Sequence, residues 1–143
     1  MTVERILSDK GRAVVTVEPD RTLAEAARLL TEKRIGAVVV SDKSRPVIGI
    51  LSERDIVRGI ASHGAQILEE PVSRCMTTKV VTCVGHTGVL EVLELMTNGK
   101  FRHVPVVEDH QLVGIVSIGD IVKYRLAQAE AETRAMRDYI ATA

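Results

Sequence analysis

The feature that most constrains the fold is a motif that occurs twice. Residues 49–55 read Gly-Ile-Leu-Ser-Glu-Arg-Asp, and residues 114–120 read Gly-Ile-Val-Ser-Ile-Gly-Asp. In each copy a short apolar strand leads directly into a helix, with Ser52 or Ser117 as the N-cap and Asp55 or Asp120 three residues later. A strand-to-helix junction with free N–H groups, a hydroxyl and a carboxylate is able to hold a polar ligand.

The duplication extends over most of the chain. Residues 80–83 align with residues 14–17 at an offset of 66, and the offset becomes 65 at the motif because one loop residue is lost. Buried strands are predicted at 13–17, 37–40 and 47–51, with helices at 22–34 and from Ser52 to about His63. A capping box at Thr22 and Glu25 opens the first of these helices, and Gly36 is expected to end it. The repeated unit is therefore β-α-β-β-α.

These patterns predict an α/β fold of two tandem repeats packed with pseudo-two-fold symmetry. Two copies are too few for a solenoid, which needs about three. A short lead-in helix is predicted before each repeat, at residues 3–7 and 72–76. The predicted organisation is a first repeat with its lead-in helix at 1–63, a connector at 64–71, a second repeat at 72–126 and a helical extension at 127–143.

Charge and composition exclude several classes of protein. Lysine plus arginine and aspartate plus glutamate number 19 each, so the basic excess of a nucleic-acid-binding protein is missing. No apolar run approaches the roughly 18 residues that span a membrane, and the N-terminus is too polar for a signal peptide. Two cysteines form no disulfide framework. We expect a cytoplasmic protein without nucleic-acid or membrane partners.

The doubled strand-Gly-x-x-Ser-x-x-Asp-helix pattern within paired β-α-β-β-α units resembles the cystathionine-β-synthase (CBS) domain pair, or Bateman module. The resemblance covers residues 3 to about 125. It implies a regulatory module without catalysis that binds an adenosine-bearing ligand between its repeats: AMP, ADP, ATP or NAD(H), with S-adenosylmethionine ranked behind them. The resemblance implies these nucleotide-binding positions: Thr16, Val17, Gly36, Ala37, Val38, Ser52, Arg54, Asp55, Val81, Thr82, Arg102, His103, Val104, Pro105, Ser117 and Asp120.

The resemblance also gives each polar group a role. It implies that the aspartates accept hydrogen bonds from ribose hydroxyls and that the serines reach ribose or phosphate. Arg102 and His103 are implied to approach phosphate, whereas the aligned residues of the first repeat are Gly36 and Ala37. We therefore expect unequal sites, with phosphate held better beside Asp120 than beside Asp55. Because the chain has one Phe and no Trp, an adenine is expected to lie between aliphatic side chains.

Other readings stay open. The serine and aspartate pairs are also explained as helix caps alone, in a ligand-independent scaffold. Cys83 and His86 have tolerable metal-ligand spacing but lack a second pair at a suitable distance, so no metal site is predicted. The chain has no P-loop, no dinucleotide-binding glycine motif, no nucleophile elbow and no zinc-protease motif, so no catalytic residues are predicted.

The last predicted helix is longer than the repeat requires. It runs from Asp120 to about Ile140 and carries a seam with 4-3-4-3-4 spacing. The alternative is a tail folded onto the first repeat. With the seam and the family resemblance together, we expect an isologous homodimer and an unidentified regulated protein as partners. The seam comprises Val122, Leu126, Ala129, Thr133, Met136 and Ile140.

Overall fold

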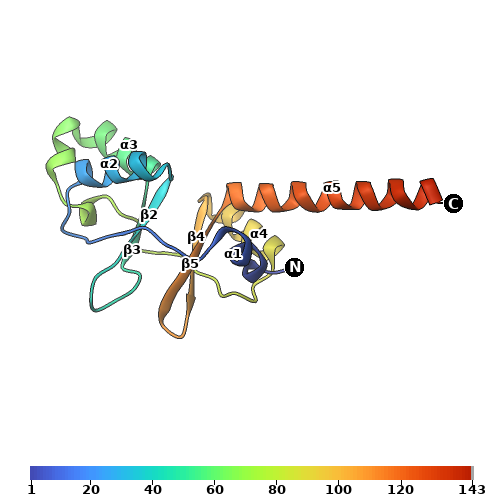
Figure 1. The fold of residues 1–143 in the computed structure, drawn as a ribbon. Coiled ribbons are helices and arrows are strands. Elements are labelled where there is room, and N and C mark those ends of the chain that lie inside the picture. The colour runs from blue at the N-terminus through green and yellow to red at the C-terminus, as the bar shows by residue number, and fades with distance from the viewer. Residues whose placement is uncertain (143) are drawn as a thin grey trace.

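The computed structural model describes residues 1–142 and places the two repeats in two neighbouring lobes (Figure 1). The first lobe contains β1 (Thr16–Val17), α2 (Leu23–Lys33), β2 (Ala37–Val40), β3 (Gly49–Ser52) and α3 (Glu53–His63). The second contains α4 (Val89–Gly99), β4 (His103–Glu108), β5 (Gln111–Ser117) and α5 (Ile118–Thr142). Three further segments are α1 (Val3–Lys10) and the 3₁₀ turns η1 (Ala65–Glu69) and η2 (Val72–Arg74).

The two sheets confirm the alignment of the repeats. In the first sheet β1 is parallel to β2 and β2 is antiparallel to β3, with Ala37 opposite Ser52. In the second sheet β4 is antiparallel to β5, with His103 opposite Ser117. Because the register is the same, the junction before β2 and the junction before β4 are equivalent positions. Gly36 and Ala37 in the first lobe therefore occupy the same structural positions as Arg102 and His103 in the second.

The expected strand at residues 80–83 does not form. In the first lobe, the N–H of Val39 donates to the carbonyl of Val15 over 3.3 Å. The equivalent donor in the second lobe would be Pro105, which has no N–H. Only Cys83 pairs there, donating to the carbonyl of Pro105 over 3.0 Å. The residues before it are released from the sheet, so the second sheet has two strands among the described residues. The first strand is also shorter than predicted, at two residues.

Each lead-in segment precedes one repeat in the sequence but packs into the lobe of the other repeat. Val3, Ile6 and Leu7 of α1 are buried in the hydrophobic core of the second lobe. Val72 of η2 is buried in the core of the first. Figure 1 shows α1 beside α4 and β5, far from the elements that follow it in the chain. The predicted boundary at residue 63 remains a prediction, but the packing crosses it in both directions.

The helix ends show which local signals operate. Half of the predicted capping box at Thr22 and Glu25 forms: the Thr22 hydroxyl accepts from the N–H of Glu25 over 3.1 Å, whereas the Glu25 carboxylate accepts from Arg21 Nη1 over 3.3 Å. Gly36 does not end this helix: Arg34 does, in the left-handed conformation at φ 55°. The equivalent residue Lys100 ends α4 with φ 58°. Both helices thus end at a left-handed residue that is not glycine, which the positions of the glycines in the sequence did not indicate.

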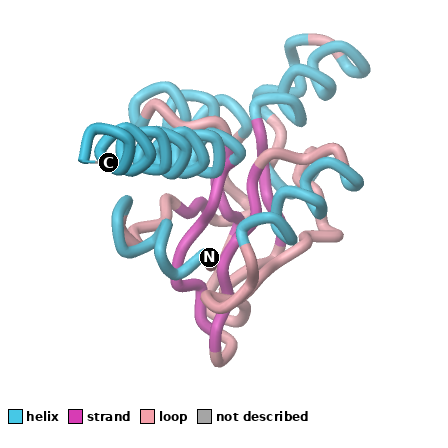
Figure 2. The backbone as a smooth tube through the Cα atoms, turned by 90° about the vertical axis from the view of Figure 1, so that its right-hand side faces the viewer, coloured by secondary structure: helices cyan, strands magenta, loops and turns pink. Residues whose placement is uncertain are grey.

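The extension of α5 projects away from both lobes (Figures 1 and 2). It is 25 residues long and begins at Ile118, two residues before the predicted start. The alternative of a tail folded onto the first repeat is wrong, since Leu126, Met136 and Ile140 are all exposed. Within residues 1–142, no helix is both long and apolar enough to cross a membrane.

Candidate functional site

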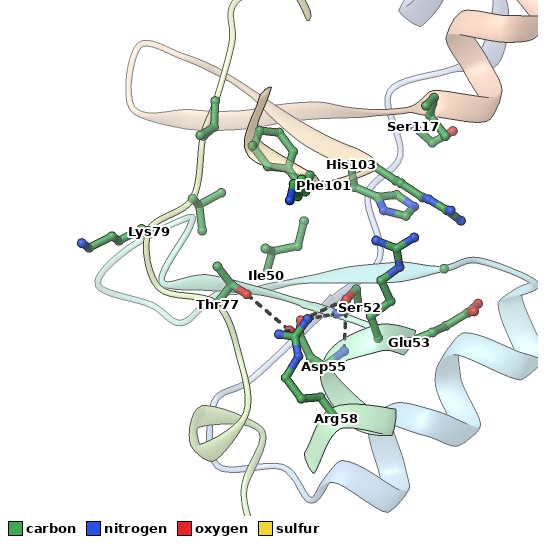
Figure 3. Close-up of a pocket in the computed structure, with 18 of the residues that line it drawn as sticks. Ile50, Ser52, Glu53, Asp55, Arg58, Thr77, Lys79, Phe101, His103 and Ser117 are labelled. Carbon is green, nitrogen blue, oxygen red and sulfur yellow. Dashed lines mark hydrogen bonds and ion pairs between the residues drawn. The ribbon is translucent and has the colours of Figure 1, made fainter. Parts of the chain in front are cut away.

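A cleft of about 670 Å³ lies between the two lobes. We call it the Asp55 cleft. One wall is the junction of β3 and α3, and the opposite wall is the junction before β4 together with the start of α5 (Figure 3). The segment from Thr77 to Val81, which the missing strand releases, closes one side. The cleft therefore depends on both repeats and on the chain that joins them.

Asp55 is the only charged side chain buried within the described part of the chain, at 8% exposure. Its Oδ2 accepts from the N–H of Ser52 over 2.9 Å, and the Ser52 hydroxyl accepts from the N–H of Asp55 over 3.3 Å. This reciprocal pair is the predicted capping box. The other oxygen, Oδ1, has longer contacts, to Thr77 Oγ1 at 3.4 Å and Arg58 Nη1 at 3.7 Å. Capping thus uses one carboxylate oxygen and leaves the second able to accept from a ligand hydroxyl.

Cations outnumber carboxylates around the cleft. Its acidic lining residues are Glu53 and Asp55. The cationic side chains of the lining are Arg54, Arg58, Lys79, Lys100 and Arg102. The lining therefore carries a net positive charge even when its histidine is neutral, and such a concave surface attracts phosphate.

His103 lies at the boundary between the lobes. Burial lowers the pKa of its imidazole below the ordinary value, and this outweighs the opposing effect of the Asp120 carboxylate. The ring is therefore neutral at pH 7. It packs against Gly36, where a Cβ would lie 3.2 Å from the His103 Cε1. Glycine at position 36 thus makes room for an imidazole contributed by the other repeat.

The apolar lining includes an aromatic ring. Ile50, Val81 and Phe101 line the cleft, and Figure 3 shows Ile50 and Phe101 between the two polar walls. The expectation that an adenine would meet only aliphatic side chains is corrected, because the single Phe of the chain lies here. An aromatic face and branched aliphatic groups together suit a planar base.

The second motif has a different setting, which we call the Asp120 site. The Ser117 N–H donates to Asp120 Oδ2 over 2.8 Å, and the Ser117 hydroxyl accepts from the N–H of Asp120 over 3.1 Å. Lys10 Nζ also donates to this Oδ2, over 2.7 Å. Burial alone would raise the pKa of Asp120, but the bonds from Lys10 and Ser117 outweigh it and hold the pKa below the ordinary value. Asp120 does not line the Asp55 cleft.

The structure brings half of the sequence-predicted positions together. Those that line the Asp55 cleft are Gly36, Ser52, Arg54, Asp55, Val81, Arg102, His103 and Ser117. Thr16 and Val17 line a separate groove on the first lobe, and Thr82 is exposed. The remaining positions other than Asp120 are buried in strands: Ala37, Val38, Val104 and Pro105.

The placement of the basic pair differs from the expectation. Arg102 and His103 belong to the repeat of Asp120, yet they line the cleft that contains Asp55. The reason is that the junction before β4 faces the first turn of α3 across the lobe boundary (Figure 3). Reasoning within one repeat missed this cross-pairing. It also missed Arg58, although its i,i+3 spacing from Asp55 places both on one helix face, and it missed Thr77 and Lys79 in the connecting segment.

Neither cysteine lines the Asp55 cleft. Cys83 is buried in the second core, where burial, with Glu91 and Glu108, raises its pKa to about 11. Such a thiol is protonated and unreactive at neutral pH. Among residues 1–142, no group of three or more histidine, cysteine or acidic side chains could hold a metal ion.

Comparisons with known proteins agree with this architecture. The family model described as CBS domain matches twice, at residues 4–62 and 72–127. The crystal structure of the CBS-domain containing protein ATU1752 from Agrobacterium tumefaciens is 49% identical, with a TM-score of 0.84 over 87% of this chain and 92% of that one. The CBS domain pair of protein MJ0100, solved with 5'-methylthioadenosine and S-adenosyl-L-methionine, is 26% identical, with a TM-score of 0.80 over 90% of this chain and 98% of that one.

A curated relative is the mitochondrial CBS domain-containing protein CBSX3 of Arabidopsis thaliana. It is 31% identical over 97% of this chain and 71% of its own length. Two other relatives are also longer than this chain, which spans 66% of one and 23% of the other. The similarity therefore concerns the paired repeats rather than everything that such proteins contain.

Proposed function

Because the chain belongs to the CBS-domain family and carries two copies of the domain, we propose that it is a non-catalytic regulatory module that binds an adenine nucleotide. The observation that carries the proposal is the Asp55 cleft. It combines a buried carboxylate with one loosely engaged oxygen, an apolar base-sized wall and an excess of cations. In this proposal Asp55 accepts from ribose hydroxyls, Ile50 and Phe101 contact adenine, and Arg102 binds phosphate.

The charge of the cleft favours a phosphorylated ligand. S-adenosyl-L-methionine, found with MJ0100, carries a positive sulfonium, which the arginine and lysine lining disfavours. AMP, ADP, ATP and NAD(H) carry the negative charge that the lining matches. Among these, ligands with more phosphate gain more from Lys79, Lys100 and Arg102, because Arg102 can bind phosphate bidentately and the two lysines add positive charge.

Thermal unfolding tests the proposed function. A ligand that binds only the folded chain stabilises it by about 2.7 kcal/mol at a hundredfold excess over Kd. AMP, ATP and NADH should each raise the melting temperature by several degrees, GMP by less, and S-adenosyl-L-methionine by less than ATP. No shift with any adenosine compound at millimolar concentration would support the scaffold, in which the aspartates only cap helices.

We also propose that the module associates as an isologous homodimer. The supporting observation is α5, which projects from the lobes with exposed apolar residues at heptad spacing (Figure 1). A self-complementary seam of this kind suits a second copy of the chain. Removing residues 127–143 should weaken association in analytical ultracentrifugation while leaving the melting temperature nearly unchanged, since residues 127–142 contribute no buried core residue. A full-length chain that stays monomeric at micromolar concentration would contradict the proposal.

A further inference from the structure

The Asp120 site already contains a cation from the chain itself. Lys10, the last residue of α1, donates from Nζ to Asp120 Oδ2 over 2.7 Å and to the carbonyl of Ile115 over 2.9 Å. The two side chains are only 33% and 21% exposed. An ammonium that bonds two acceptors at once is held more firmly than one in a single surface ion pair.

The pseudo-symmetry of the repeats shows what this ammonium replaces. Ile115 and Asp120 correspond to Ile50 and Asp55 in the first repeat. There Thr77 contacts the same two acceptors, with its N–H on the Ile50 carbonyl over 2.8 Å and its hydroxyl on Asp55 Oδ1 over 3.4 Å. The Asp55 acceptors thus meet neutral donors from this segment, one of them distant, and their nearest cation is Arg58 Nη1 at 3.7 Å. The Asp120 acceptors meet a charged donor at short range.

We propose that Lys10 is a built-in occupant of the Asp120 site, and that it limits the protein to one nucleotide per chain. The proposal rests on the proposed function, because it assumes that Asp55 receives the ribose of a bound nucleotide. Lys10 Nζ bonds Asp120 Oδ2, the oxygen that also accepts from the N–H of Ser117. A ribose hydroxyl that approaches this carboxylate therefore meets an acceptor whose charge the ammonium already compensates, and the hydrogen bond that it gains is weaker than at a less compensated carboxylate. Nucleotide therefore binds at Asp55, and the Asp120 site stays closed.

The arrangement of the remaining cations supports this division. Arg102, the basic residue that the sequence places in the repeat of Asp120, lines the Asp55 cleft instead. The Asp120 carboxylate therefore takes its positive partner from α1, 110 residues away in sequence. Lys10 pairs with Asp120 and links α1 to β5 and α5, so a single side chain both fixes the lead-in helix and weakens the second carboxylate as an acceptor.

Calorimetric titration with ATP tests the proposal. The unaltered chain should bind one ATP. Lys10→Ala and Lys10→Met should each bind a second ATP, and Lys10→Met keeps the aliphatic stem. The Kd for this second ATP should be at least about tenfold lower than for any second ATP on the unaltered chain. Arg5→Gln is the matched control: it removes one positive charge from α1 at an exposed position paired only with Asp9, and it should behave as the unaltered chain. Adding Asp120→Asn to Lys10→Met should abolish the gained site.

The outcomes separate the two proposals. One ATP per chain in both the unaltered protein and the folded Lys10 variants overturns the role of Lys10 and leaves the proposed function intact. Two equal sites in the unaltered chain also overturn it. No binding to the unaltered chain or to either variant overturns both proposals, whereas binding only after Lys10 is replaced supports the role of Lys10 and places the nucleotide away from Asp55.

Discussion

The Asp55 and Asp120 sites share a backbone and differ in their neighbours. In both, a serine and an aspartate cap a helix that follows directly from a strand, with nearly the same hydrogen bonds. At Asp55 the neighbouring segment supplies a hydroxyl at 3.4 Å, and at Asp120 it supplies an ammonium at 2.7 Å. The duplicated motif therefore builds the acceptor twice, and in our proposal the neighbouring segments decide which acceptor a ligand binds.

The same comparison applies to the cores. The second lobe contains three buried residues of α1, whereas the first lobe contains a short 3₁₀ turn in the corresponding place. The lead-in segments thus differ in length and in the charge they bring to each site. Changes to either segment should affect the lobe into which it packs, and the following predictions test this in order of decreasing effect.

Leu7→Ala should have the largest effect on stability. Leu7 is 1% exposed in the core of the second lobe, and truncating such a leucine costs about 2–5 kcal/mol. Urea unfolding should measure the loss. Hydrogen exchange should show faster opening of β4, β5 and α5, with β2 and β3 less affected. Met76→Ala, at the equivalent and less buried position, is the control. Faster exchange mainly in β2 and β3 would contradict the crossed packing.

Alanine at the two motif glycines should have unequal effects. A Cβ at Gly49 would lie 2.8 Å from the backbone oxygen of Thr77, which is unable to move without displacing the segment that closes the cleft. A Cβ at Gly114 would meet the side chain of Leu7 at 2.7 Å, and a side chain can shift more easily. We expect Gly49→Ala to lower the free energy of unfolding by about 1–3 kcal/mol and Gly114→Ala by less. Equal losses of the free energy of unfolding would contradict this, because they would mean that the backbone at Thr77 shifts as easily as the side chain of Leu7.

The ion pair at Asp120 should make stability depend on pH. Because the folded-state pKa of Asp120 is lowered, its contribution is present above the unfolded value of about 4 and is lost as the pH falls through the folded pKa. Lys10→Gln should therefore reduce the free energy of unfolding by up to about 1 kcal/mol at pH 7. The difference from the unaltered chain should shrink as the pH falls below about 4. A difference independent of pH would show that Lys10 acts through packing alone.

Much of the fold was predictable because it rests on local patterns. The repeated Gly-x-x-Ser-x-x-Asp motif and the runs of β-branched residues predicted the β-α-β-β-α units, and the Thr22 cap formed at the predicted residue. The missing strand at residues 80–83 was predictable in principle, because Pro105 occupies the position of the donor Val39. The exchange of lead-in segments was not, since an amphipathic helix shows that it has an apolar face but not which core that face enters.

The sequence indicated residues of the candidate cleft better than it indicated their arrangement. Ser52, Asp55, Arg102 and His103 were all selected, and all line one cleft. Their pairing was missed because alignment relates equivalent residues, whereas the cleft joins residues that are not equivalent. Lys10 carried no signal of its own, because a lysine at the end of a helix is ordinary, and only the folded structure brings it to Asp120.

Calorimetry with ATP on Asp55→Asn and Asp120→Asn tests the central claim most directly. Both changes keep the shape of the side chain and weaken the acceptor. We expect Asp55→Asn to raise Kd roughly ten- to a hundredfold, as for loss of a hydrogen bond to a charged group, and Asp120→Asn to leave the tight site nearly unchanged. Melting temperatures of both variants without ligand would show that each is folded. A larger loss of affinity with Asp120→Asn, or equal losses with both, would contradict the assignment of the nucleotide to the Asp55 cleft.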